Sequence, residues 1–231
     1  MFQKNIQIIR PLFGAHAALD RARAAREPLE IEMPERKIII DSKGDITRLE
    51  TRQNLQSHRI IEDFMILANV CAAETLKSDK AVCMYRVHDK PDTEKLANLK
   101  RLLTKMSIPF TKNENPKPSS FNKVLRKARK MSLDVLIGQV VLQAQSQAYY
   151  SPNNIGHFGL ALTGYAHFTS PIRRYADLLV HRAIISRCNL GIGGSINENR
   201  AEMNRIGESL SRTERQAMAA ERAAVDRFVA L

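Results

Sequence analysis

The sequence predicts a helix-rich protein of mixed α/β (α+β) class. The chain has 231 residues, of which 44% are apolar and 26% charged, so it has an ordinary globular composition. It is long enough to bury a sizeable core. Several long segments carry apolar residues at helical spacing. Only short runs, bounded by turn residues, have the character of strands.

The first half of the chain contains two long helical segments and a hairpin. In the second helix the apolar residues recur every three or four positions, from Ile61 through Met65 to Leu76. We expect helices over Leu12–Arg26, Asn54–Leu76 and Thr93–Met106, and strands over Lys37–Ile40, Ile46–Leu49 and Val82–Val87, the first two joined by a turn at Ser42–Asp45.

The second half begins with a loop rich in Pro, Asn and Ser at residues 107–120. We expect helices over Phe121–Lys130, Ser132–Gln147, Pro171–Arg187 and Asn197–Val229, short strands over Phe158–Leu162 and Tyr165–Phe168, and a turn at Gly191–Gly194. Between Met131 and Ser170 the one Asp, Glu, Lys or Arg is Asp134, which indicates the interior of a domain.

Charge and composition narrow the function classes. The formal net charge is +12, and residues 112–187 hold eleven Lys or Arg against three acids, which gives +8 of that total. A polyanionic partner fits this balance, although a basic protein without one fits too. No apolar run is long enough for a membrane helix, and the N-terminus lacks a secretory signal. Three cysteines without a CxxC motif favour a reducing compartment, so we expect the cytoplasm.

An anion site is predicted where the helix at Pro171 begins. Ser170 is a good N-cap and Pro171 suits the first helical position. Arg173 and Arg174 would then lie near the positive end of the helix dipole, which is unfavourable unless an anion binds there. Phosphate is the natural ligand. The alternative is a helical ion pair between Arg173 and Asp177.

Aromatic and histidine residues surround these arginines. Phe158, Tyr165, Phe168 and Tyr175 suit stacked bases, although packing in the core is the ordinary role for most of them. His157, His167 and His181 form no recognised zinc pattern. The chain also lacks a P-loop, a GxGxxG motif and a GxSxG motif, which excludes Walker-type nucleotide hydrolysis, dinucleotide binding and a serine-hydrolase elbow.

The segment GHFGLALTGYAHFTSPIRRYADLLVHRA closely resembles the signature of the ribonuclease II/ribonuclease R exoribonucleases, in their RNB catalytic domain. HRIIEDFMILANVCAAE, YRVHDKPDTEKL and SRTERQAMAAERAAVDRF are similar to further family segments. The resemblance extends over nearly all 231 residues and is greater to the ribonuclease R branch. It implies a fold with helices packed around a sheet-based core and a channel for single-stranded RNA.

The resemblance also implies an activity and a set of site residues. The family degrades RNA processively from the 3′ end by hydrolysis and releases nucleoside 5′-monophosphates. By motif position, Arg173 is the arginine that stabilises charge on the scissile phosphate. Glu62 and Glu221 match acids that hold the terminal nucleoside, although each would also suit a solvated helix face. The remaining residues that we expect to contact RNA are Arg174, Tyr175, His157, Phe168 and Ser170.

One part of the family pattern has no match. The family binds Mg²⁺ with an Asp cluster of the form D-x-x-x-x-x-D-x-D-D, and no two of the ten Asp residues here are adjacent. Cold-shock and S1 domains have no counterpart either. We therefore expect residues 1–231 to be the C-terminal portion of an RNB catalytic domain, from a truncated, split or excised chain, without protein ligands for the metal.

Three expectations follow. As an enzyme, the chain belongs to a hydrolytic 3′-to-5′ exoribonuclease but is inactive unless an upstream half of the domain completes it. As a binding module, it holds single-stranded RNA without cutting it. As an isolated half domain, it is poorly folded because the surface that its other half covers is exposed.

Overall fold

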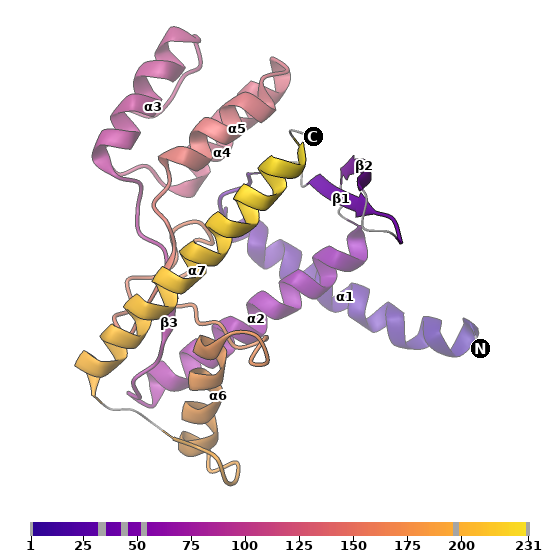
Figure 1. The fold of residues 1–231 in the computed structure, drawn as a ribbon, viewed down its shortest axis with the longest axis vertical. Helices are drawn as coiled ribbons and strands as arrows, with labels where there is room; N and C mark the ends of the chain where they lie inside the picture. The colour runs from indigo at the N-terminus through magenta and orange to yellow at the C-terminus, as the bar shows by residue number, and fades with distance from the viewer. Residues whose placement is uncertain (1, 32–35, 43–45, 52–54, 196–198, 230–231) are drawn as a thin grey trace.

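The structure is a computed structural model that describes residues 2–31, 36–42, 46–51, 55–195 and 199–229 (Figure 1). Helices dominate, which confirms the predicted helix-rich mixed class, and the strands form two separate two-stranded antiparallel pairs, β1 with β2 and β3 with β4. The elements are α1 (Phe2–Arg26), β1 (Arg36–Ile40), β2 (Ile46–Thr51), α2 (Gln56–Ser78), β3 (Tyr85–Val87), α3 (Thr93–Lys105), α4 (Pro118–Lys130), α5 (Asp134–Ala144), β4 (Tyr149–Ser151), α6 (Tyr175–Arg187) and α7 (Arg200–Val229).

Two apolar clusters form the interior. The first lies where β3 and β4 meet α2, α6 and the beginning of α7, and Met84, Val87 and Val180 are among its fully buried members. The second joins α3, α4 and α5, which stand together at one end of the molecule in Figure 1, around Phe121 and Ile137. Figure 1 also shows α1 projecting from the body after it crosses α2. No helix in the described ranges is long and apolar enough to cross a membrane.

Close packing of backbone on backbone places α7 against β4. Ser211 Oγ accepts a hydrogen bond from Tyr150 N at 2.9 Å and donates one to Gly207 O at 2.7 Å. A Cβ atom on Gly207 would lie 2.6 Å from Tyr150 O, closer than real contacts allow. Small residues at positions 207 and 211 therefore let the helix approach the strand, and they set the path of α7 across β3 in Figure 1.

Two predicted strands are wrong. Residues 158–162 and 165–168 form no strand, and isolated bridges join His157 to His88 and to Leu162. Gly156 and Ala161 have φ values of 80° and 52°, in the left-handed region that turns the chain sharply. The segment is a loop because its backbone groups bond to side chains, to other loop residues and to single positions at Arg86 and His88, in place of a continuous strand ladder.

The β1–β2 hairpin and the helices are otherwise as predicted, with shifted ends. The first helix begins at Phe2 in place of Leu12 and contains Pro11, in an exposed stretch where water can replace the hydrogen bond that a proline cannot donate. The strand predicted from Val82 begins at Tyr85. Helix α4 begins early because Pro118 occupies its first turn, and α5 ends early because Gln145 is extended. Residues 43–45 of the predicted hairpin turn, and the predicted start of the last helix, lie outside the described residues.

We expect Gly207→Ala to lower the stability of the protein by about 1–3 kcal/mol, because the added methyl group forces α7 away from β4. Thermal unfolding followed by circular dichroism measures this. Gly14→Ala is the matched control, since nothing lies within 4 Å of a Cβ at that helical position, and alanine is the better helix former. Equal melting temperatures for the two variants would contradict the close approach of α7 and β4.

Candidate functional site

The loop between β4 and α6, residues 156–174, carries most of the predicted site residues, and we call it the signature loop. His88, directly after β3, holds its first part. His88 N donates to Gly156 O at 3.1 Å, and His88 O accepts from Phe158 N at 2.8 Å. The imidazole ring bonds as well, because Nδ1 accepts from Gly159 N at 2.8 Å and Nε2 lies 2.7 Å from Ser146 O.

These contacts fix the protonation state of His88. A backbone N–H can bond only to an unprotonated Nδ1, and a carbonyl oxygen can bond only to a protonated Nε2, so His88 is the neutral Nε2–H tautomer. Burial lowers the pKa of His88 in agreement with this state. A Cβ on Gly159 would lie 3.0 Å from the His88 ring. The glycine at position 159 therefore leaves the space that the ring needs.

Asn69 on α2 holds the middle of the signature loop. Its side chain is buried, donates from Nδ2 to Tyr165 Oη at 2.9 Å, and accepts at Oδ1 from Phe168 N at 2.9 Å. The amide group thus satisfies two buried polar groups of the loop at once. It is the Asn of the segment IEDFMILAN, so this segment contributes to the site by fixing the loop.

Asp177 holds the last part of the signature loop, and here one prediction is wrong. Ser170 is not the N-cap of α6, because α6 begins at Tyr175 with Arg174 as its N-cap in an extended conformation. Residues 170–174 form a separate turn in which Arg173 N and Arg174 N approach Ser170 O at 3.3 and 3.1 Å. The cause is the carboxylate of Asp177, which is fully buried and accepts from Ser170 N at 2.8 Å.

The same carboxylate distinguishes the two arginines. Asp177 Oδ1 pairs with Arg174 Nη2 at 2.8 Å, so the ion pair that the sequence offered to Arg173 is made by Arg174. Arg173 is exposed on the turn, and it has no ion-pair partner within the described part of the chain. Of the two predicted phosphate ligands, Arg173 is therefore the one whose charge is uncompensated.

A polar network connects α7 to the signature loop. Arg86 on β3 pairs with Glu214 on α7 at 2.6 Å and lies over the Tyr150 ring, 4.7 Å from its centroid. Tyr150 Oη in turn lies 2.8 Å from Nδ1 of His167 in the loop. Burial, and then the nearby Arg174, lower the pKa of His167 to about 3. This histidine is therefore neutral at pH 7 and serves as a hydrogen-bonding group.

The aromatic residues divide between the interior and the surface. Tyr165 is buried, and Phe168 stacks on His181 with centroids 4.1 Å apart, while His181 Nε2 lies 2.8 Å from Phe168 O. His157 packs against Tyr165, and burial followed by the neighbouring His88 lowers its pKa to about 3. Tyr175, at 48% exposure, is the aromatic residue of the set that is open to a ligand.

The two predicted glutamates lie on helices outside the signature loop. Glu62 is exposed on α2, next to Asp63, whose buried carboxylate contacts His16 and Arg23 on α1 at 3.2 and 3.3 Å. Glu221 is exposed on α7, seven residues beyond Glu214 and therefore about 10 Å further along the helix on a similar face. Neither glutamate contacts the signature loop through any hydrogen bond or ion pair between described residues.

The donor groups in the described part of the chain do not fit a magnesium site. Mg²⁺ takes carboxylate and water oxygens in octahedral geometry, whereas the buried carboxylates here are already bonded to Arg174, His16 and Arg23. No group of three or more Asp, Glu, His or Cys side chains suited to a metal occurs among the described residues. That residues 1–231 lack protein ligands for the metal stays a prediction.

Sequence reasoning missed Asn69, His88, Arg86, Glu214 and the fixing role of Asp177. Asn69 and His88 lie in segments that resemble the family, so the signal was present, but only the fold brings them to the loop. The sequence indicated Glu214 less clearly, because Glu214 and Glu221 on α7 are each followed by an arginine. Only the ion pair with Arg86 in the structure distinguishes Glu214 from Glu221.

We expect Asn69→Ala to destabilise the protein by about 2–4 kcal/mol, because it leaves the Tyr165 hydroxyl and the Phe168 N–H buried without partners. Chemical unfolding measures the change. Asn98→Ala, at an exposed position on α3, is the control and is expected to cost less than about 0.5 kcal/mol. If the two variants are equally stable, the amide of Asn69 does not hold the loop.

The buried histidines predict a loss of stability in mild acid. Below pH 6.5 the unfolded chain takes up protons at His157 and His167, whereas the folded protein does so only near pH 3. Stability is therefore present above pH 6.5 and falls as the pH decreases, by about 1 kcal/mol per pH unit for each histidine. Unfolding free energies measured between pH 7.5 and 5.5 test this.

A variant with His157→Asn and His167→Gln provides the comparison for the pH experiment. Its stability is expected to vary less over the same interval, while Asn98→Ala, at an exposed position of α3 that does not titrate, leaves the dependence unchanged. An equally steep dependence in the double variant would show that other groups cause it.

Comparisons with known proteins identify the family of this chain. The RNB domain family model matches residues 3–188. Ribonuclease R of Escherichia coli is 34% identical over 229 residues, which cover 96% of this chain and 28% of that protein. The chain spans about a third or less of the length of the curated relatives that it matches.

Solved structures share the fold. The apo form of Mycoplasma genitalium RNase R has a TM-score of 0.89 at 24% identity, over 97% of this chain and 36% of that one. The same enzyme in complex with ribose-methylated single-stranded RNA has a TM-score of 0.86 at 25% identity, with the same coverage. The family model, the sequence relatives and the solved structures agree on one assignment, and this chain belongs to the RNB domain family.

Proposed function

We propose that residues 1–231 form the C-terminal portion of the catalytic domain of a hydrolytic 3′-to-5′ exoribonuclease, which releases nucleoside 5′-monophosphates. The observation that carries this proposal is Arg173, an exposed cation without a partner among the described residues, on a turn that Asp177 fixes. A guanidinium in this state can bind a phosphate without first losing another ion pair.

The surroundings of Arg173 support a role in catalysis as well as in binding. Arg86 and Arg174 are paired with carboxylates, and His157 and His167 are neutral. Positive charge on this part of the loop is therefore concentrated on Arg173. A fixed donor aimed at the developing charge of a scissile phosphate stabilises the transition state without reorganisation.

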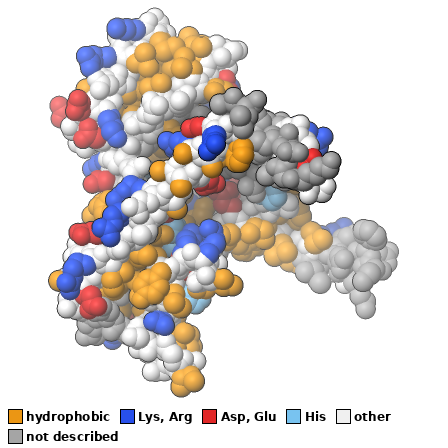
Figure 2. Space-filling view, viewed as in Figure 1, with side chains coloured by type: hydrophobic (Ala, Val, Ile, Leu, Met, Phe, Trp, Pro, Cys, Tyr) orange, Lys and Arg blue, Asp and Glu red, His pale blue; other side chains and the backbone are white. Residues whose placement is uncertain are grey.

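Single-stranded RNA is the partner that fits. The RNase R structure with ribose-methylated single-stranded RNA shares the fold. Figure 2 shows basic side chains along α7 with hydrophobic surface beside them, a combination that suits phosphates and base faces. We assign base contact to Tyr175 and phosphate contact to Arg173 and Ser170. His157, Phe168 and Arg174 keep the shape of the loop, and we assign contact with the terminal nucleoside to Glu62 on α2 and Glu221 on α7, which are both exposed.

The metal requires residues that this chain does not supply from its described part. Mg²⁺, which the family resemblance implies, provides water activation and charge stabilisation when bound. We propose that its Asp ligands belong to an upstream half of the same catalytic domain. The three cysteines are free, which agrees with a reducing compartment, and we propose that the enzyme acts in the cytoplasm.

A second candidate is a non-catalytic module that holds single-stranded RNA. Its specific support is the unpaired charge of Arg173 within residues 112–187, which carry an excess of eight positive charges. Among the described residues no group of metal ligands accompanies this charge. The two functions differ in one respect, because only the first gains activity when the missing part of the domain is supplied.

We expect the pure chain to leave 5′-labelled single-stranded RNA intact in the presence of magnesium, on a denaturing gel. When the upstream segment of a relative that carries the Asp cluster is supplied, the RNA is expected to shorten from the 3′ end. Arg173→Ala is then expected to slow the shortening at least 100-fold, which corresponds to the loss of one transition-state contact of about 3 kcal/mol.

Arg126→Ala, at an exposed arginine of α4, is the control for charge and is expected to retain most of the activity. Shortening by the pure chain that disappears in Arg173→Ala would overturn the proposed dependence on an upstream half. RNA binding without cleavage, even in the completed domain, would favour the binding module.

A further inference from the structure

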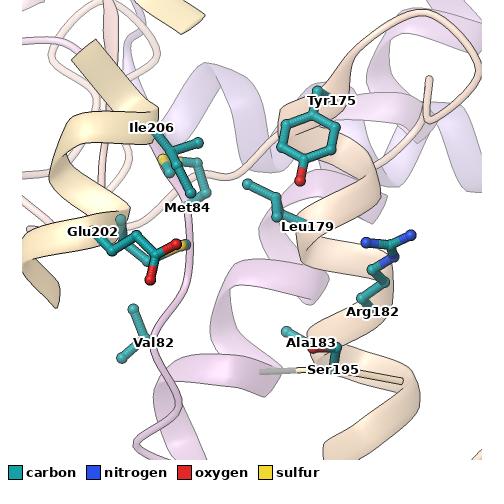
Figure 3. A pocket seen from close by; sticks show the side chains of 10 residues that line it. Val82, Met84, Tyr175, Leu179, Arg182, Ala183, Ser195, Glu202 and Ile206 are labelled. Carbon is teal, nitrogen blue, oxygen red and sulfur yellow. The ribbon is translucent and has the colours of Figure 1, made fainter. Parts of the chain in front are cut away.

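A small hollow lies between α6 and α7, where the signature loop ends (Figure 3). Its volume is about 190 Å³, below the roughly 300 Å³ at which sites for whole small molecules begin. Met84 and Met203 at its base are buried, so the hollow has a fixed floor. The apolar side chains that line it are Val82, Met84, Leu179, Ala183, Met203 and Ile206.

Three polar groups surround the hollow. Figure 3 shows the Tyr175 hydroxyl, the Arg182 guanidinium and the Glu202 carboxylate on different sides of it, the first two from α6 and the third from α7. The Arg182 guanidinium can only donate hydrogen bonds, the Glu202 carboxylate can only accept them, and the Tyr175 hydroxyl can do both. A ligand that satisfies all three must carry a donor and an acceptor at its edge and an apolar face.

The hollow is adjacent to the proposed phosphate ligand. Tyr175 is two residues from Arg173, and two residues of chain span at most about 7 Å. Because the backbones of these two residues lie within about one nucleotide length, RNA bound to Arg173 passes within reach of Tyr175. The proposed phosphate ligand Arg173 and the apolar lining of the hollow thus follow each other closely along the chain.

We propose that this hollow is a subsite for a single nucleobase of the bound RNA, without preference for sequence. The inference rests on the proposed function, since it requires RNA on Arg173. All four bases have a flat apolar face, and each carries at least one N–H donor and one acceptor on its Watson–Crick edge. Glu202 accepts from the donor and Arg182 donates to the acceptor, so every base finds both partners.

The experiment removes one base at a time from the RNA. A set of 5′-fluorescent RNA hexamers, each with an abasic nucleotide at a different position, is titrated with the full chain in EDTA at low salt, and fluorescence anisotropy gives the affinities. We expect at least a fivefold loss of affinity at one position or two adjacent ones, as for one stacked base. Tyr175→Ala, Arg182→Met and Glu202→Gln are each expected to reduce this positional loss to less than twofold.

A matched variant separates the subsite from general electrostatics. Arg212→Met also removes one exposed cation, from α7 outside the hollow. It is expected to weaken all hexamers to the same extent and to keep the positional loss. Melting temperatures equal to that of the parent chain show that the four variants are folded.

Two results overturn the inference in different ways. A positional loss that persists in Tyr175→Ala and Arg182→Met, or that never occurs, shows that the hollow holds no base, while RNA binding that depends on Arg173 leaves the proposed function intact. If the chain binds none of the hexamers, the subsite and the proposed function fail together.

Discussion

The buried carboxylate of Asp177 is the group on which the arrangement of the candidate site depends. A charge that is removed from water is costly unless it is paired and hydrogen-bonded. Asp177 meets this requirement at Oδ1, which accepts from the Ser170 N–H and the Arg174 guanidinium, both at 2.8 Å, while its buried Oδ2 has no hydrogen-bond partner among the described residues. These two bonds delay the start of α6 to Tyr175 and close the preceding turn. They also decide which of two adjacent arginines carries a free charge.

The rest of the signature loop is held by neutral groups. His88, Asn69 and the Tyr150–His167 pair bond to the loop from β3, α2 and β4, and none of them carries charge at pH 7. Neutral hydrogen bonds in a buried setting fix geometry without adding an electrostatic field of their own. Outside the Asp177–Arg174 pair, the shape of the loop is therefore held by neutral groups, and Arg173 supplies its unpaired charge.

Local patterns explain how far the sequence could predict this structure. The helical stripe from Ile61 to Leu76 and the apolar runs of β1 and β2 depend on neighbours in the chain, so those elements were predictable. The segment 158–168 was read as strands because its aromatic and apolar residues suit a sheet, but its actual partners are side chains 70 or more positions away. The predicted N-cap at Ser170 was wrong for a related reason, since the Asp177 carboxylate within α6 accepts from Ser170 N and the helix begins only at Tyr175.

The candidate site was predictable only in part for the same reason. Motif position predicted Arg173 as the phosphate ligand, but the sequence wrongly offered Arg173 as the partner of Asp177, because that pairing depends on which guanidinium reaches the buried carboxylate. Nor could it reveal that Arg86 and Glu214 pair across α7 and β3, 128 residues apart. Contacts of this kind are set by how α7 packs, and that packing depends on the absence of a side chain at Gly207. A residue with no functional group of its own thus determines where the charged residues of the closing helix lie relative to the loop.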